Sequence, residues 1–200
     1  LPIENFKRVQ ENHLNGTFVT CKLVGDRMLK TGGGTIVTMS SVLALRPGPV
    51  LGYGAGKAAI VNLTQSLAVQ WSKKNIRVNT ICPGWVDTPF IRKQEADGRD
   101  LSHIIRMTPM GRMATPLEIA NVALFLLSDA SSAMTGSICV ADCGITLSGG
   151  FYLAEICQLS LNSVFGHIKK NVKKCDERMD SVTYESNEKI STKIMEINKK

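Results

Sequence analysis

The segment Thr35-Ile-Val-Thr-Met-Ser-Ser41 decides the fold, because its β-branched and apolar residues predict a buried strand that ends in two hydroxyl side chains. Before it, apolar residues recur at helical spacing up to Gly32-Gly33-Gly34, where reversal of the chain requires residues without a Cβ. After it, a loop rich in proline and glycine leads into a helix predicted from Tyr53 to about Lys73. Residues 76–81 then alternate β-branched with polar side chains, which predicts a second strand.

The same alternation continues toward the carboxyl end. Residues 85–113 carry mixed charges without a sustained period, and we interpret them as a long irregular lid or binding loop. Thr115-Pro-Leu-Glu118 is a capping box with proline at the first helical position, so a helix is predicted to begin there. Residues 137–141 supply a third strand. Two neighbouring parallel strands need a connection about as long as a helix, and here a helix follows each of the first two strands. The predicted fold class is therefore α/β with a parallel sheet.

Composition and charge narrow the function classes. The chain has 200 residues, 44% hydrophobic content and a net charge of +7, but its basic residues are mostly interleaved with acids, which favours a solvated surface. The lysine pairs at 169–170 and 173–174 lack an aromatic platform, so nucleic-acid binding is a weak alternative. Six cysteines without CxxC spacing or a histidine cluster predict reduced thiols, no metal site and a cytoplasmic setting. No apolar run reaches the roughly 18 residues of a membrane span, so no membrane association is expected.

Tyr53 and Lys57, four residues apart in Tyr53-Gly-Ala-Gly-Lys57, lie on the same face of the predicted helix. Transfer of a hydride to a carbonyl requires a proton for the oxygen, and a tyrosine supplies one near neutral pH only when its phenol is made more acidic. The ammonium of Lys57 meets this requirement because it favours the phenolate. A tyrosine four residues before a lysine is common by chance, and by itself it favours a pair of surface side chains on an amphipathic helix. The motifs around Tyr53 and Lys57 favour a catalytic site instead.

Two predicted strands end in groups that can bind a ligand. Ser40-Ser41 places hydroxyls after the first strand, and Pro83-Gly84-Trp-Val-Asp-Thr88 places a backbone turn and a hydroxyl after the second. The carboxyl ends of parallel strands share one edge, where open α/β sheets bind their ligands. We therefore expect these groups and the helical pair to converge on one crevice.

Four motifs, in order and spacing, closely resemble the short-chain dehydrogenase/reductase family, and in particular its 3-oxoacyl-carrier-protein reductase-like members. They are Thr35-Ile-Val-Thr-Met-Ser-Ser41, Tyr53-Gly-Ala-Gly-Lys57-Ala-Ala, Arg77-Val-Asn-Thr-Ile-Cys-Pro-Gly84 and Met134-Thr-Gly136. The resemblance covers about residues 5–147 and implies a Rossmann-like, doubly wound parallel sheet, here only its carboxyl-terminal half of three strands with helices. Residues 1–147 are thus predicted to be the catalytic part of that domain, and 148–200 a tail outside the family, partly helical or disordered.

The resemblance also implies an activity: an NAD- or NADP-dependent oxidoreductase that interconverts a small-molecule alcohol with a ketone or aldehyde. Tyr53 would be the general acid/base, Lys57 would also hold the nicotinamide ribose, and Ser41 would orient the substrate. The nicotinamide would be seated by Pro83, Gly84, Val86 and Thr88. In the family, the helices near residues 5–30 and 53–73 commonly pack against another subunit, so a homodimer or homotetramer is expected.

Three positions depart from the family pattern. Members usually have one more residue between the serine and the tyrosine, so a shortened loop favours Ser41 whereas strict spacing favours Ser40. His13 stands where many relatives have an asparagine that helps hold a water near the lysine; a helix histidine with a satisfied hydrogen bond is the simpler interpretation. Cys143 in Asp142-Cys143-Gly144 stands where relatives often have glycine, and a positive φ there would favour glycine.

The glycine-rich strand-to-helix turn that binds a dinucleotide pyrophosphate is not recognisable in the sequence, because Gly32-Gly33-Gly34 precedes a strand. We therefore expect the family's first half to precede Leu1 in the natural protein and this chain to be a fragment. Without that half, residues 35–39 would form a sheet edge with unpaired backbone groups, which another element such as the tail could cover. The alternative function is a non-catalytic dimerising or binding module, and affinity for the cofactor separates the two.

Overall fold

The computed structural model describes residues 1–150, and Leu1–Gly149 form one unit of it. The tail predicted from residue 148 onward lies almost entirely outside the described residues. The division of the chain into a part up to residue 147 and a tail therefore stays a prediction.

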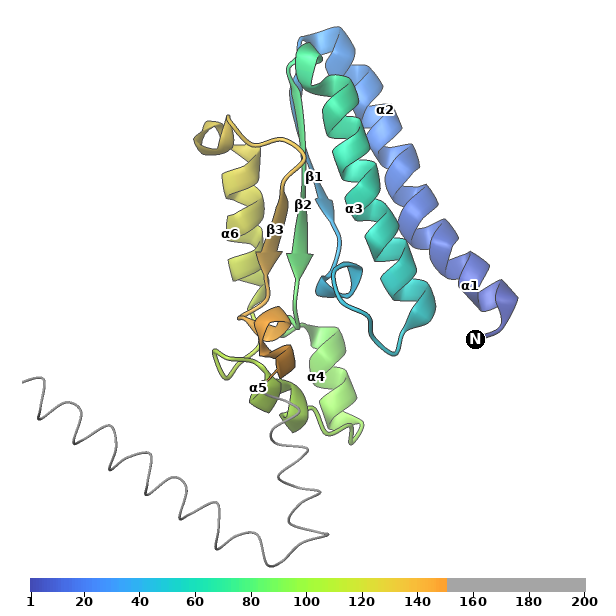
Figure 1. The fold of residues 1–200 in the computed structure, drawn as a ribbon, viewed down its shortest axis with the longest axis vertical. Coiled ribbons are helices and arrows are strands. Elements are labelled where there is room, and N and C mark those ends of the chain that lie inside the picture. Colours follow the sequence, from blue (N-terminus) through green and yellow to red (C-terminus); the bar gives the residue numbers. More distant parts are fainter. Residues whose placement is uncertain (151–200) are drawn as a thin grey trace, which may run out of the picture. The chain divides into compact units, whose positions relative to one another are not determined.

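Three parallel strands form the sheet, in the order β1-β2-β3 (Figure 1). Met39 at the end of β1 pairs with Ile81 of β2, and Cys82 pairs with Val140 of β3. The predicted α/β class and parallel sheet are confirmed. The strands are β1 (Gly34–Met39), β2 (Ile76–Pro83) and β3 (Ile138–Ala141).

Helices cover both faces of this sheet. Figure 1 shows α2 and α3 on one side of the strands and α6 on the other, which is the doubly wound arrangement that the family resemblance implies. The capping box of Thr115 and Glu118 is present at the start of α6. The helices are α1 (Ile3–Gln10), a π-helical turn η1 (Glu11–Asn15), α2 (Gly16–Thr31), α3 (Leu51–Trp71), α4 (Pro89–Ala96), α5 (Ser102–Met107) and α6 (Pro116–Leu127).

Each face of the sheet has its own apolar cluster. Under α2 and α3, the cluster includes Trp71, whose ring would lie 2.7 Å from a Cβ built on Gly25, so the glycine lets the two helices approach closely. Under α6, Ile81, Ala114, Ile119 and Leu126 are buried together. These two clusters hold the helices on the sheet through the removal of apolar surface from water.

Residues 85–113 are more regular than predicted, because they include α4 and α5. Thr88 begins α4 as its N-cap, with Pro89 at the first position, and a small apolar cluster of Ile91, Leu101 and Ile104 packs these helices together. Short helices with mixed charge have too few turns for a periodic signal, which explains why the sequence pattern misses them.

The outer edge of β1 has no partner strand among the described residues, since β1 pairs only with β2. A groove of about 470 Å³ runs between this edge and α2, lined by Asn12, Thr17, Cys21, Val24, Ile36 and Thr38 among others.

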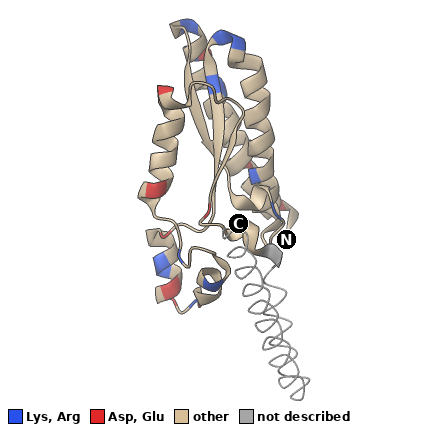
Figure 2. Ribbon diagram, turned by 60° about the vertical axis from the view of Figure 1, so that its left-hand side comes forward, with Lys and Arg blue, Asp and Glu red and all other residues tan. Residues whose placement is uncertain are grey.

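Charged side chains lie mainly on the helices and loops, with both signs mixed, as Figure 2 shows for the described part of the chain. In the three strands the one charged residue is Arg77.

Candidate active site

Tyr53 and Lys57 lie one turn apart on α3, as their spacing predicts. The Nζ atom of Lys57 is 5.5 Å from the centroid of the Tyr53 ring, within reach of a cation–π contact. The tyrosine is half-buried and the lysine is 9% exposed. The structure thus brings the two predicted residues together as a cation beside a phenol ring.

The Lys57 ammonium also joins α3 to the sheet. It donates a hydrogen bond of 2.9 Å to the backbone carbonyl of Met39, the last residue of β1. Burial lowers the pKa of Lys57 from its ordinary value, and the neighbouring Cys82 acts in the opposite direction. Within residues 1–150 the bond to Met39 is the one hydrogen bond that the ammonium donates, so two of its three donors remain for a ligand at the carboxyl end of β1.

The two serines after β1 make different contacts. Ser40 is 3% exposed, and its hydroxyl donates 2.7 Å to the backbone carbonyl of Lys57. The oxygen of Ser41 accepts from the amide of Leu43 at 3.2 Å, capping the short 3₁₀ turn Val42–Ala44. Within residues 1–150 the Ser41 hydroxyl donates no hydrogen bond. Its proton is therefore available to a substrate oxygen, whereas that of Ser40 is engaged.

Pro83 is the last residue of β2 and Gly84 begins the turn that follows, at the same sheet edge. A Cβ on Gly84 would lie 2.8 Å from the Cβ of Asp142, so only glycine fits where this turn meets the turn after β3. Cys143, next to Asp142, has φ of 53°, the left-handed conformation that glycine adopts without strain. The Asp142 carboxylate stabilises this turn by accepting from the amides of Gly144 and Thr146 at 2.8 and 2.9 Å.

Val86 and Thr88 hold the loop that follows. Val86 forms a parallel bridge with Ala114, and the Thr88 side chain accepts from the amide of Ile91. Within the described part of the chain, neither residue hydrogen-bonds to Tyr53 or Lys57. The structure therefore brings Tyr53, Lys57 and Ser40 together, with Ser41 next to Ser40 in the chain, and places Val86 and Thr88 in the loop after β2.

The Arg77-Val-Asn79 motif holds the loop before β3. The Arg77 guanidinium donates to the carbonyls of Leu126, Ser128 and Met134, at 3.0 to 3.1 Å. Asn79 is fully buried and its amide bonds both to the Met134 carbonyl and to the amide of Ser137, at 2.9 and 3.0 Å. These two residues are structural within the motif, because their side chains point to backbone groups.

The sequence pattern favours a structural role for His13, and the structure places its ring against the ring of Tyr53. Its ring makes an edge-to-face contact with the ring of Tyr53, with centroids 5.2 Å apart and planes at 87°. Its backbone carbonyl accepts from the Thr17 hydroxyl at 2.6 Å and from the amide of Gly16. The Gly16 amide is shared between this carbonyl and that of Glu11.

These residues fit one end of a nicotinamide dinucleotide. The two remaining donors of Lys57 and the half-buried phenol of Tyr53 suit the hydroxyls of the nicotinamide ribose. For the pyrophosphate, residues 1–150 contain no strand that runs through a glycine-rich turn into a helix. No group of three or more metal-ligating side chains occurs in this part of the chain.

The family model described as Enoyl-(Acyl carrier protein) reductase matches residues 1–146. A galactitol 2-dehydrogenase of Rhizobium johnstonii is 39% identical over 70% of this chain and 55% of its own length. An NAD-dependent glycerol dehydrogenase of Listeria innocua is 41% identical over 74% of this chain and 58% of its own length. A solved structure from Beutenbergia cavernae, with NADP bound at low occupancy, has a TM-score of 0.70 and 34% identity, covering 74% of this chain and 59% of that chain.

The fold and the Tyr53–Lys57 pair at the strand ends define an α/β protein of the Rossmann type. With the family match, the assignment becomes specific: the chain belongs to the short-chain dehydrogenase/reductase family. It spans somewhat more than half the length of the curated relatives that it matches. Among the helices of residues 1–150, none combines the length and apolar character needed to cross a bilayer.

Proposed function

We propose that the protein is an NAD- or NADP-dependent oxidoreductase that interconverts an alcohol with a ketone or aldehyde. The observation that carries this proposal is the buried ammonium of Lys57, 5.5 Å from the Tyr53 ring and at the carboxyl end of β1. The names of the two dehydrogenase relatives, which act on galactitol and glycerol, support an alcohol substrate. The NADP in the solved relative and the NAD in the name of the glycerol enzyme support either cofactor.

In this proposal, Tyr53 gives a proton to the carbonyl oxygen in reduction and takes one from the alcohol in oxidation. Lys57 stabilises negative charge on the phenol oxygen and holds the nicotinamide ribose with its free donors. Ser41 orients the substrate oxygen, which its uncommitted proton allows. The nicotinamide supplies or accepts the hydride when it is bound.

We assign Pro83, Gly84, Val86 and Thr88 to the seat of the nicotinamide. Support comes from their position in one continuous loop after β2, with Gly84 fixed by its close approach to Asp142. The loop is anchored by paired bonds, since the Asp87 amide donates to the Ala114 carbonyl at 2.8 Å and the Ala114 amide donates to Trp85 at 3.0 Å. A rigid loop of this kind can orient a ring without an ordering cost at the moment of binding.

We also propose that the protein forms a homo-oligomer. The helices α1, α2 and α3 carry several exposed apolar side chains, namely Phe6, Phe18, Val19, Leu23, Leu51 and Val69. Exposed apolar side chains in this number favour contact with a second copy. Light scattering that shows a strictly monomeric species would contradict this assignment.

Every cysteine within residues 1–150 is a free thiol, which supports the proposed reducing, cytoplasmic setting.

A second candidate is a non-catalytic binding or dimerising module. It is favoured by one observation: the described residues contain no strand that runs through a glycine-rich turn into a helix, the element that binds a pyrophosphate. A module of this kind would keep the fold and the helical surfaces but would bind no dinucleotide. Cofactor affinity therefore decides between the two functions.

The test is a titration of the natural protein with NADH and NADPH, followed by nucleotide fluorescence and by turnover of alcohol substrates. We expect saturable binding that Lys57→Met weakens, with Lys73→Met, an exposed lysine after the same helix, as the matched control. Tyr53→Phe should keep binding and lose about 10² to 10⁴-fold in turnover. Absence of binding in the natural protein would favour the binding module, and full turnover of Tyr53→Phe would refute the proton donor.

A further inference from the structure

The π-helical turn η1 presents His13 to α3. A π turn inserts one extra residue into a helix and often lies at a functional site. Here it interrupts the helical run between α1 and α2, at Glu11–Asn15. Across from it, α3 has glycine at 52 and 56: a Cβ on Gly56 would lie 3.4 Å from the Cβ of His13, and Gln10 donates to the Gly52 carbonyl at 2.8 Å. The helices therefore touch where α3 carries no side chain, and the imidazole reaches the Tyr53 ring beside them.

We propose that His13 is a positioning residue for Tyr53, which holds the phenol ring by an edge-to-face contact and, through its own charge state, controls the Tyr53–Lys57 pair. This inference rests on the oxidoreductase function proposed above. The ring centroids are 5.2 Å apart at 87°, a geometry that favours contact between two aromatic rings. The Lys57 ammonium lies 5.5 Å from the centroid of the same tyrosine ring, so both an imidazole and an ammonium lie close to the phenol.

The charge state of His13 matters because of what faces it. From α3 the titratable groups are Tyr53 and Lys57. On its own helical run, the Glu11 carboxylate is exposed and accepts from Asn15 at 2.5 Å, and from α2 the group at His13 is the neutral hydroxyl of Thr17. Burial, and then the positive charge of Lys57, lower the pKa of His13 from its ordinary value.

Neutral His13 is compatible with an ammonium nearby, whereas a protonated ring adds a second cation next to Lys57. The repulsion opposes the position of Lys57 against Tyr53 and the carbonyl of Met39. His13 protonation therefore removes the arrangement that proton transfer requires, and activity should fall on the acid side of neutrality. At neutral and alkaline pH the imidazole acts only through its contact with the ring.

The first arm of the test needs no activity. In the NMR spectrum of the natural protein, the His13 ring signals, assigned by their loss in His13→Gln, should move in Tyr53→Leu because the ring current disappears. Their titration midpoint should rise in Lys57→Met, because a repelling cation is removed. His103, exposed on α5, is the internal control, and its signals should respond to neither variant. His13 signals that ignore both substitutions would overturn the proposal.

The second arm compares pH–rate profiles of His13→Ala, His13→Phe and the control His103→Phe. His13→Ala should lower kcat/KM about 10-fold across the pH range, since a loosely held general acid is misplaced. His13→Phe keeps an aromatic ring without a charge, so it should recover most of the activity at pH 8 and retain it to lower pH than the natural protein. An equal loss of kcat/KM in His13→Ala and His13→Phe would overturn the role of His13. So would a fall in activity at low pH that is the same in His13→Phe as in the natural protein. A natural protein without turnover or cofactor binding would instead refute the proposed function, and the NMR arm would still decide whether the contact exists.

Discussion

The hydroxyl of Ser40 donates 2.7 Å to the backbone carbonyl of Lys57, and the ammonium of Lys57 donates 2.9 Å to the backbone carbonyl of Met39. The two bonds run in opposite directions between the end of β1 and the first half of α3. Together they hold the helix that carries Tyr53 against the sheet edge. The position of the proposed general acid is therefore set by neighbours of the reactive residues as well as by its own helix.

Ser40→Ala and Ser41→Ala should have different effects. Loss of the buried Ser40 donor should cost about 1 kcal/mol of unfolding free energy. Ser41→Ala should leave stability nearly unchanged but reduce turnover about 100-fold, because the substrate oxygen loses its donor. Urea denaturation and steady-state kinetics measure both quantities. If Ser40→Ala loses turnover but keeps its stability, Ser40 and not Ser41 orients the substrate oxygen.

Asn79→Ala should destabilise the fold strongly. Its buried amide bonds to the Met134 carbonyl and to the Ser137 amide, so Asn79→Ala leaves the Ser137 amide without this partner and the Met134 carbonyl with only its bond from Arg77. We expect a loss of about 2 to 3 kcal/mol, the cost of leaving buried polar groups unsatisfied. Asn62→Ala, at an exposed position of α3, is the matched control and should change stability by less than about 0.5 kcal/mol. Similar losses in the two variants, measured by chemical denaturation, would contradict the assigned role of Asn79.

Gly25→Ala should also destabilise, despite the higher helix propensity of alanine. The added Cβ would meet the Trp71 ring at less than 3 Å, and either α2 or the ring must shift. We expect a net loss of about 1 to 3 kcal/mol from overpacking. Gly16→Ala in the same helix meets only the Glu11 carbonyl at 3.7 Å and should instead gain up to about 1 kcal/mol. Thermal unfolding of the two variants checks the prediction, and a stabilised Gly25→Ala would show that the helices can separate without cost.

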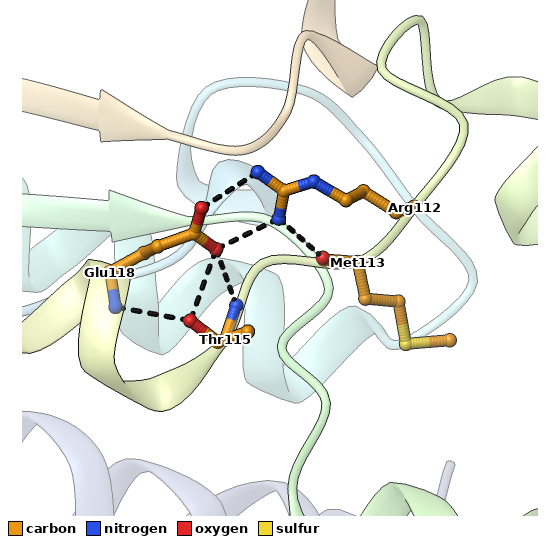
Figure 3. A network of polar contacts seen from close by, with 4 residues as sticks. All are labelled: Arg112, Met113, Thr115 and Glu118. Carbon is orange, nitrogen blue, oxygen red and sulfur yellow. Dashed lines mark hydrogen bonds and ion pairs between the residues drawn. The ribbon is translucent and has the colours of Figure 1, made fainter.

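Glu118 links acid stability to the capping box of α6 (Figure 3). Its carboxylate accepts from Arg112 at 2.6 Å and from the backbone amide of Thr115 at 2.7 Å, and these bonds lower its pKa from 4.5 to about 2. A carboxylate whose pKa is lower in the folded state contributes stability above its unfolded pKa and loses it as the pH falls through the folded one. The contribution of Glu118 should therefore be complete above pH 4.5 and disappear toward pH 2.

The measurement is the unfolding temperature of the natural protein and of Glu118→Gln between pH 7 and pH 2. The variant should unfold at a lower temperature at pH 7, and the difference should shrink to near zero at pH 2. Glu4→Gln, which removes an exposed pair with Lys7, is the control and should have no measurable effect at any pH. A constant difference between natural protein and Glu118→Gln across the range would contradict the pKa shift of Glu118.

Much of the fold could be predicted from local patterns. The β-branched run before Ser40 and the alternation of residues 76–81 predict strands because side chains repeat every second residue in a strand and a strand buries one or both faces. The four-residue spacing of Tyr53 and Lys57 predicts one helical face, and the structure shows the two side chains together. The helices within residues 85–113 could not be found in this way, since each is too short to show a period.

The sequence by itself determined the alternation of strands and helices, the capping box of α6 and the pairing of Tyr53 with Lys57, because each depends on residues close together in the chain. It also determined the parallel sheet, because a helix-sized connection between successive strands is what parallel pairing requires. Only the tertiary structure decided which serine keeps a free hydroxyl proton, which histidine contacts the tyrosine and which glycine admits a tryptophan. The partners in these contacts lie 17 residues apart for Ser40 and Lys57, and further apart for His13 with Tyr53 and for Gly25 with Trp71. Such contacts form when helices pack on a sheet and on each other, and no local period in the sequence records that packing.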